Sequence, residues 1–124
     1  MPVIPAPASA THALDGTRFT SLATPSRGSR DTAVWQVEIE PGTPAVPHSL
    51  TREEVFVVLD GAAAVEIDGV SGIARQRDAI VVPADVEFRL LNAGATPLRL
   101  LCCFPVGGRA RTDDGATFTP PWAE

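Results

Sequence analysis

The chain has 124 residues, a formal net charge of -5 and a pI near 4.9. This length fits one domain with one hydrophobic core, and the acidic balance, without any basic run, argues against nucleic acid or an anionic membrane as a partner. The apolar runs are far shorter than the roughly 20 residues of a membrane-spanning helix, and the first ten residues lack the segments of a signal peptide, so we expect a cytoplasmic protein.

The residue inventory restricts the possible chemistry. The chain has no lysine and no tyrosine, which removes lysine Schiff bases, a covalent pyridoxal-phosphate anchor and a tyrosine general acid. Its two cysteines, Cys102 and Cys103, are adjacent, so they cannot join distant elements, and on a strand they would point to opposite faces. We therefore expect reduced thiols.

The predicted elements are all strands. After an extended N-terminal arm, residues 1–16, short apolar runs alternate with clusters of Gly, Pro, Asn and Asp, and no window of helical length carries an apolar stripe. A β domain is expected over residues 17–108, and a C-terminal arm that packs on the barrel or on a partner subunit over residues 109–124. In chain order, the expected strands are residues 18–23, 32–40, 53–60, 62–68, 78–83, 86–92 and 97–104.

Hydrophobic patterning distinguishes two kinds of strand. TAVWQVEIE, residues 32–40, alternates apolar with polar residues from Trp35 onward, which indicates one wet face. VFVVL and AIVVP are apolar on both faces, so we expect them to be covered on both sides, within a double-layered barrel or at a subunit contact. Turn signals such as LDGAA and IDGVSG separate the strands, and this spacing favours a β-sandwich or β-barrel.

The segment from Gly42 to Gly61 is similar to the first sequence motif of the cupin superfamily, the small RmlC-like jelly-roll barrels. That motif runs glycine, five residues, His-x-His, three or four residues, glutamate, six residues and glycine. In this chain Gly42, His48, Glu54 and Gly61 stand at matching intervals, whereas Leu50 stands where the second histidine would be.

The segment from Arg77 to Asn92 resembles the second cupin motif, which runs glycine, five residues, Pro-x-Gly, two residues, histidine, three residues and asparagine. Pro83 and Asn92 match it, Arg77 and Asp85 replace glycines, and Phe88 stands where the last metal-binding histidine would be. The resemblance implies an all-β fold, the cupin-type double-stranded β-helix or jelly-roll barrel, and suggests a homodimer. Open sheet edges and apolar strands that need cover favour the same two-fold pairing.

The resemblance also implies a metal site of three histidines and one glutamate, of which only His48 and Glu54 are retained. Two ligands make a poor cage, because open catalytic sites for iron, manganese or zinc take at least three protein ligands. We therefore expect no cofactor; if a divalent metal bound, His48 and Glu54 would be its ligands. Cys102 could approach the pocket from the last strand, but a packed, small apolar role is favoured, and His12 is expected to face solvent.

Alternation along PHSLTREEVFVV places His48, Leu50, Glu54, Phe56 and Val58 on one side, provided that no bulge intervenes. Together with Phe88, Leu90 and Cys102 they are expected to line an apolar pocket. Burial would raise the pKa of Glu54, whereas a protonated His48 would lower it. Our hypothesis is a metal-independent isomerase, cyclase or lyase in which His48 and Glu54 exchange protons with a small hydrophobic molecule.

Three alternatives stay open at this point. His48 and Glu54 could be remnants, hydrogen-bonded to each other or to backbone and water in a barrel that merely folds. The domain could bind or sense a small molecule without catalysis, or it could be a metal-dependent dioxygenase with a non-standard ligand set. Among weaker candidates, Arg89 is expected to point away from the pocket, Asn92 to serve a turn, and Trp122 to pack over the barrel or a partner.

Overall fold

The computed structural model describes residues 3–124, and its regular secondary structure consists of antiparallel strands apart from two short 3-10 helices. One wall of the barrel is a six-stranded sheet in the order β1-β2-β3-β10-β5-β8. Its strands are β1 (His12–Leu14), β2 (Thr17–Ala23), β3 (Thr32–Ile39), β10 (Leu98–Pro105), β5 (Glu54–Asp60) and β8 (Ala79–Val82).

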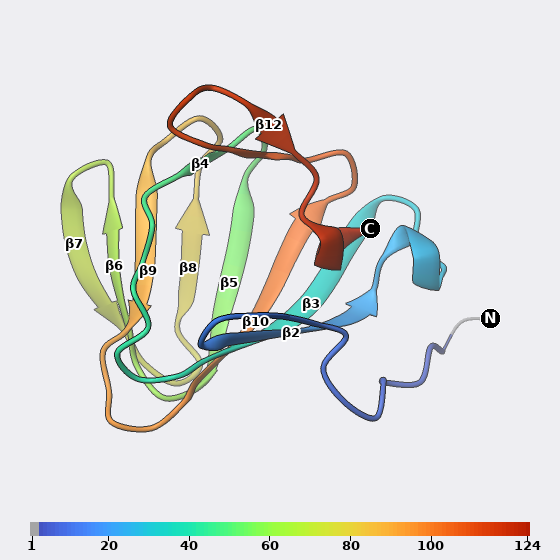
Figure 1. The fold of residues 1–124 in the computed structure, drawn as a ribbon, viewed down its shortest axis with the longest axis horizontal. Coiled ribbons are helices and arrows are strands. Elements are labelled where there is room, and N and C mark those ends of the chain that lie inside the picture. Colours follow the sequence, from blue (N-terminus) through green and yellow to red (C-terminus); the bar gives the residue numbers. More distant parts are fainter. Residues whose placement is uncertain (1–2) are drawn as a thin grey trace.

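The remaining strands form two three-stranded sheets, β7-β6-β9 and β12-β11-β4. An isolated bridge joins them, because the backbone N–H of His48 donates to Phe88 O at 3.0 Å and the N–H of Phe88 donates to His48 O at 2.9 Å. This arrangement confirms the expected jelly-roll barrel (Figure 1). The elements are β6 (Ala63–Ile67), β7 (Val70–Ala74), β9 (Phe88–Asn92), β4 (Ser49–Leu50), β11 (Ala110–Arg111) and β12 (Thr117–Phe118), with short 3-10 helices η1 (Pro25–Arg27) and η2 (Pro121–Ala123).

All seven expected strands are present, with ends that shift by no more than two residues. The sequence patterns missed the short strands β1, β4, β11 and β12, and the interpretation of IDGVSG as a turn alone was wrong. Asp68 and Gly69, with φ of 50° and 78°, form a tight hairpin turn, and β7 follows at once, paired with β6. A two-residue Asp-Gly turn with positive φ at both positions matches the twist of paired strands, so the second strand can begin directly after it.

Two residues that stand at glycine positions of the second cupin motif have positive φ. Arg77 and Asp85 have φ values of 75° and 64°, in the left-handed region that glycine adopts without strain. Backbone hydrogen bonds hold both turns in place, from the N–H of Arg77 to Val58 O and from the N–H of Asp85 to Leu50 O, each 2.7 Å long. Both residues therefore take a backbone conformation that glycine would adopt without strain.

Both terminal segments add to the barrel. In the N-terminal segment β1 pairs with β2, and Arg27 Nη2 donates to Pro5 O at 2.6 Å. In the C-terminal segment β11 pairs with β4, and the ring of Trp122 in η2 stacks on Phe19 with centroids 3.6 Å apart. The N-terminal segment thus extends the edge of the six-stranded sheet, and the C-terminal segment extends the sheet that contains Leu50.

The outer face of the six-stranded sheet keeps an apolar area that no other part of residues 3–124 covers fully. Register places Val55 beside both Cys103 and Val81, and Val57 beside Leu101. Val81 is 50% exposed and the other four are half-buried. Their strand neighbours on the inner face, Phe56, Ile80 and Cys102, are buried. We expected VFVVL and AIVVP to be covered on both faces, either within a double-layered barrel or at a subunit contact. The described residues do not supply a second layer over the outer face.

Candidate functional site

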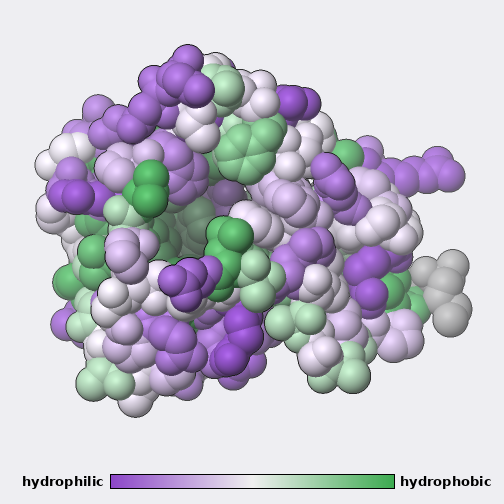
Figure 2. Space-filling model, viewed as in Figure 1, coloured by the Kyte–Doolittle hydropathy of each residue, from purple (hydrophilic) through white to green (hydrophobic). Residues whose placement is uncertain are grey.

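A cavity of about 800 Å³ opens between the walls of the barrel, near the upper end of the range for small-molecule sites. Figure 2 shows it as a hollow in the surface, with apolar side chains inside it and at its edge. Its lining comes from both walls, from the loop before β4 and from the C-terminal segment. The aromatic members are Phe19, Trp35, His48, Phe56, Phe88, Phe118 and Trp122.

The exposure of the lining residues defines the depth of the cavity. Cys102 and Trp35 are at most 3% exposed, so they lie at its inner end. Leu14, Val46 and Phe118 also line the cavity but are 60%, 72% and 43% exposed, so they lie at its mouth. The cavity therefore runs from a sealed inner end to an open rim formed by β1, the loop before β4, and β12.

Glu54 is the one carboxylic residue at the inner end of the described lining. It begins β5, lines the cavity, is 5% exposed, and has no side-chain hydrogen bond to any residue between 3 and 124. Burial raises the pKa of its carboxyl group from 4.5 to about 8, since the apolar surroundings disfavour the charged form. At neutral pH this carboxyl group therefore holds its proton and can donate it.

His48 lies just before β4 and forms the isolated bridge with Phe88 that joins the two three-stranded sheets. Its Nδ1 is 3.0 Å from Val46 O, and because a carbonyl only accepts, Nδ1 carries the proton and donates it. The ring also packs on Phe88, with centroids 4.5 Å apart. These contacts fix the ring and leave Nε2 as the nitrogen available to a ligand in the cavity.

The structure brings His48 and Glu54 to one cavity without pairing them. The chain bends at residues 51–53 between β4 and β5, which belong to different sheets, so the two side chains reach the cavity from different sheets. No hydrogen bond or ion pair connects them among residues 3–124. Within the described structure the two side chains are therefore not hydrogen-bonded to each other, although the remnant interpretation had allowed such a bond. A ligand that lies between them could touch both.

The remaining candidates for the lining are also placed by the fold. Leu50, Phe56, Phe88, Leu90 and Cys102 line the cavity. Val58 does not: it is 1% exposed and pairs with Leu100, which lines the cavity at that level of the barrel. Alternation put Val58 on the correct face of β5 but could not show where along the strand the cavity ends.

The donor set does not fit a metal ion. Leu50 and Phe88, which have no lone pair to donate, stand at two of the four positions that the cupin motifs reserve for ligands. No group of three or more His, Cys, Asp or Glu side chains within residues 3–124 could hold a metal ion. Cys102 does not supply the missing donor, because burial, and secondarily Glu54 and Cys103, raise the pKa of its thiol well above the ordinary value. We derive no step through a metal.

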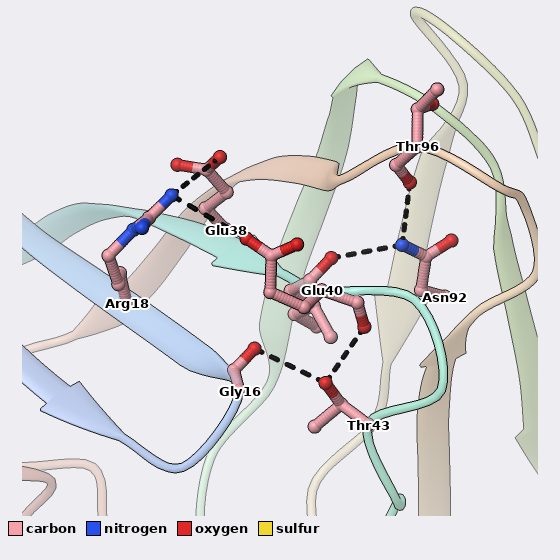
Figure 3. A network of polar contacts seen from close by, with 8 residues as sticks. Gly16, Arg18, Glu38, Glu40, Thr43, Asn92 and Thr96 are labelled. Carbon is pink, nitrogen blue, oxygen red and sulfur yellow. Dashed lines mark hydrogen bonds and ion pairs between the residues drawn. The ribbon is translucent and has the colours of Figure 1, made fainter.

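The residues given lesser roles lie outside the inner end of the cavity. Arg89 is exposed and its Nη2 lies 3.4 Å from Glu66 Oε2. His12 is half-buried, 2.9 Å from Thr11 Oγ1 and edge-on to Trp122. Asn92 is buried, and its Nδ2 donates to Ile39 O at 2.9 Å and to Thr96 O at 2.8 Å (Figure 3). It thus holds the turn after β9 against the end of β3.

The same polar network anchors the loop that carries the mouth residue Val46. Thr43 Oγ1 donates to Glu40 O at 2.8 Å and lies 3.2 Å from Gly16 O (Figure 3). A side chain at Gly16, whose φ is 77°, would collide with Thr43. The loop before β4 is therefore tied to the β1–β2 turn, which places two of the three rim segments relative to each other.

Sequence reasoning missed the contribution of the C-terminal segment to the cavity. Arg111, Phe118 and Trp122 all line it, and Arg111 Nη1 is 2.9 Å from Asp85 Oδ1. The aromatic residues on either side of two prolines, Phe118 and Trp122, were the available signal, but their position at the cavity depends on the pairing of β11 with β4, which no local pattern encodes.

None of the helices within residues 3–124 is long and apolar enough to cross a membrane.

Comparison with solved structures places the fold. KdgF from Halomonas sp. superimposes with a TM-score of 0.67 at 21% identity, over 86% of this chain and 89% of that one. An RmlC-like cupin from Shewanella frigidimarina gives 0.67 at 18%, over 78% and 82%. Salicylate 1,2-dioxygenase from Pseudoaminobacter salicylatoxidans gives 0.64 at 23%, over 78% of this chain and 26% of that enzyme. At these identities the likeness concerns the fold alone.

In sequence, the chain is 30% identical over 53 residues to an uncharacterized protein of Methanocaldococcus jannaschii, and the match spans 43% of this chain and 42% of that relative. The family described as the cupin domain matches residues 35–104. This range includes both motifs, the bridge between His48 and Phe88, and Glu54 at the inner end of the cavity. More than half of the chain is matched, and the protein therefore belongs to the cupin family.

Proposed function

We propose that the protein is a metal-independent cupin enzyme, an isomerase, cyclase or lyase, that acts by acid/base catalysis on a small hydrophobic molecule in its barrel cavity. The observation that carries this proposal is Glu54, a carboxyl group without a side-chain partner among residues 3–124, at the closed end of an apolar cavity, with its pKa raised to about 8. Such a group is costly to bury, and perturbed groups of this kind are concentrated at functional sites.

Glu54 and His48 can act on one substrate from two sides. On a β,γ-unsaturated ketone, the protonated carboxyl group of Glu54 donates to the carbonyl oxygen, while Nε2 of His48 removes a proton from the α-carbon. The C–H bond breaks, its electron pair forms a C=C bond to the carbonyl carbon, the C=O π pair moves to the oxygen, and the oxygen takes the proton of Glu54. His48 then returns its proton to the γ-carbon of the dienol and the hydroxyl proton goes back to Glu54, which moves the double bond into conjugation and restores both groups.

The test begins with ligands found by thermal stabilisation and then assayed for turnover. In Glu54→Gln and His48→Ala we expect kcat to fall about 10²- to 10⁴-fold, because each variant loses a proton-transfer group. Glu53→Gln, at the exposed neighbouring position, is the matched control and should retain activity. The rate should also decline above a pH of about 8, where Glu54 loses its proton.

Either of two outcomes would contradict the proposal. A Glu54→Gln, His48→Ala double variant that converts substrate as well as the parent would remove the acid/base role. Stoichiometric iron, manganese or zinc in purified protein, lost on His48→Ala, would instead support the dioxygenase alternative.

A non-catalytic binding or sensing domain is the second candidate. The observation in its favour is that no hydrogen bond or ion pair joins His48 to Glu54 within residues 3–124 and that Nδ1 of His48 donates to Val46 O. Ligands that stabilise the protein, bind with the same affinity to the double variant and show no turnover would identify this function.

We also propose that the protein is a homodimer in which the exposed apolar face around Val81 is covered. A surface of this kind at a sheet edge favours self-association. Val81→Arg should shift the wild-type dimer to a monomer in size-exclusion chromatography with light scattering. Ile73→Arg, at an equally exposed position on β7, should remain dimeric. A wild-type protein that is monomeric at all concentrations would contradict this proposal.

A further inference from the structure

The mouth of the cavity carries exposed apolar side chains beside the exposed polar residues Thr112, Asp113 and Asp114. Three of the eight large hydrophobic side chains that are exposed within residues 3–124, namely Leu14, Val46 and Phe118, gather at this one opening. They come from β1, the loop before β4, and β12, so the clustering is produced by the fold and not by one apolar segment. Exposed apolar groups that gather in this way mark a surface that something apolar covers.

The inner end of the cavity offers a hydrogen bond and no counter-charge. Glu54 is 5% exposed, faces the cavity, and has no side-chain partner within residues 3–124. The other lining residues assigned to this end are Trp35 and Cys102, which contribute an aromatic ring with one N–H and a thiol, and no charged group. A ligand that reaches this end must therefore satisfy one carboxyl group with one polar atom and be apolar elsewhere.

The charged residues of the lining do not favour an anion. Arg111 is the one arginine of the described lining, and its Nη1 is engaged by Asp85 Oδ1 at 2.9 Å. Asp113 and Asp114 lie on the same side, and Asp114 accepts hydrogen bonds from Thr112 Oγ1 and from the backbone N–H of Ala116. A carboxylate or phosphate would enter a cavity whose single guanidinium is occupied and whose other ionisable groups are mostly acidic.

We propose that the substrate is an elongated, uncharged molecule with one hydrogen-bond-accepting oxygen, such as a ketone carbonyl, against Glu54 and an apolar chain that leaves between Leu14, Val46 and Phe118. This inference rests on the proposed function, for which it names the substrate class. The carbonyl takes the hydrogen bond that Glu54 otherwise lacks, and the chain covers apolar surface along the cavity and at its rim. A compact molecule would leave the rim exposed, and an anion would lose its hydration without compensation.

A homologous series of probes tests this inference directly. Binding of 2-alkanones from 2-hexanone to 2-dodecanone, below micelle-forming concentrations, is measured by calorimetry and by the fluorescence of Trp35 and Trp122. Affinity should increase about fourfold for each methylene group that enters the cavity or contacts the rim, which corresponds to about 0.8 kcal/mol. Decanoate and decylamine should bind at least tenfold more weakly than 2-decanone.

Variants separate the two ends of the ligand. Phe118→Ser and Val46→Ser should weaken 2-dodecanone severalfold and leave 2-hexanone unchanged, whereas Val70→Ser, equally exposed but outside the cavity, should change neither. Glu54→Leu should weaken all the ketones by about the same factor, tenfold or more, since each loses its hydrogen bond. Three results would each overturn the inference. The first is that decanoate or decylamine binds as tightly as 2-decanone. The second is that Phe118→Ser and Val46→Ser leave the dependence of affinity on chain length unchanged, and the third is that the ketones do not bind.

The outcomes also separate this inference from the proposed function. Ketones that bind with the expected dependence on length, but whose α-hydrogens exchange with D2O no faster than without protein, would refute the enzyme and support the ligand class. A compact or anionic compound that the enzyme converts, with loss of activity in Glu54→Gln, would refute the ligand class and support the enzyme.

Discussion

The wild-type protein is expected to lose up to about 5 kcal/mol of its free energy of unfolding as the pH rises from about 4.5 to about 8, and Glu54→Gln is expected to lose none of this contribution. The unfolded chain releases the Glu54 proton near the ordinary pKa of 4.5, whereas the folded protein holds it until about 8. Between these values the native state binds the extra proton, so stability decreases with rising pH. The contribution is fully present below about 4.5 and is lost at about 8.

Urea unfolding at pH 5, 6.5 and 8 measures this effect. Other ionisable groups also titrate in this range, so the informative quantity is the difference between wild type and Glu54→Gln at each pH. Glu53→Gln should follow the wild type, because Glu53 is exposed. If the free energies of unfolding of wild type and Glu54→Gln changed in parallel with pH, Glu54 would be ionised in the folded protein. The proposed general acid would then be excluded at neutral pH.

Phe104→Ala is expected to destabilise the protein by about 3–5 kcal/mol, because it empties a closely packed part of the core. Phe104 is 1% exposed and lies edge-on to Trp35, with ring centroids 6.3 Å apart. Gly108 covers the same ring, since a Cβ at position 108 would overlap the carbons of Phe104. Gly108→Ala should therefore cost about 1–3 kcal/mol through overpacking alone.

The two substitutions should be strongly non-additive. In Phe104→Ala the ring that a Cβ at position 108 would meet is absent, so adding Gly108→Ala should cost little further stability. Urea unfolding of wild type, both single variants and the double variant gives the coupling energy, expected to exceed about 1 kcal/mol. Phe104→Leu replaces Phe104→Ala if the latter does not fold. Additive costs would show that the contact between Gly108 and Phe104 is not a packing constraint.

Much of the barrel could be predicted because strand formation here depends on local patterns. The alternation in residues 32–40 and the apolar runs around Phe56 and Ile80 place the strands and their inner faces, and burial of alternate residues agrees with them. The strands that were missed are short, and β4, β11 and β12 have two residues each. Such elements form because a partner strand is already in place, and the partner is distant in sequence.

The site was predictable in its members and not in its geometry. The spacing from His48 to Glu54 indicated two groups that reach one pocket, and both line the cavity. Alternation treated them as neighbours on one face, whereas the bend at residues 51–53 puts them on different sheets. The direction of the pKa shift of Glu54 also depended on the fold, since a charged partner would have lowered the pKa and burial raises it.

By itself the sequence determined that the chain is an all-β cupin, that Leu50 and Phe88 stand where the cupin motifs have histidines, and that these 124 residues include no lysine or tyrosine. These properties depend on residue type and spacing. Only the tertiary structure decided that Glu54 is buried without a partner among the described residues, that the C-terminal segment lines the cavity, and that Leu14, Val46 and Phe118 meet at its mouth. Each of these depends on which distant segments come together, because burial and hydrogen bonding are properties of the surroundings that the folded chain creates.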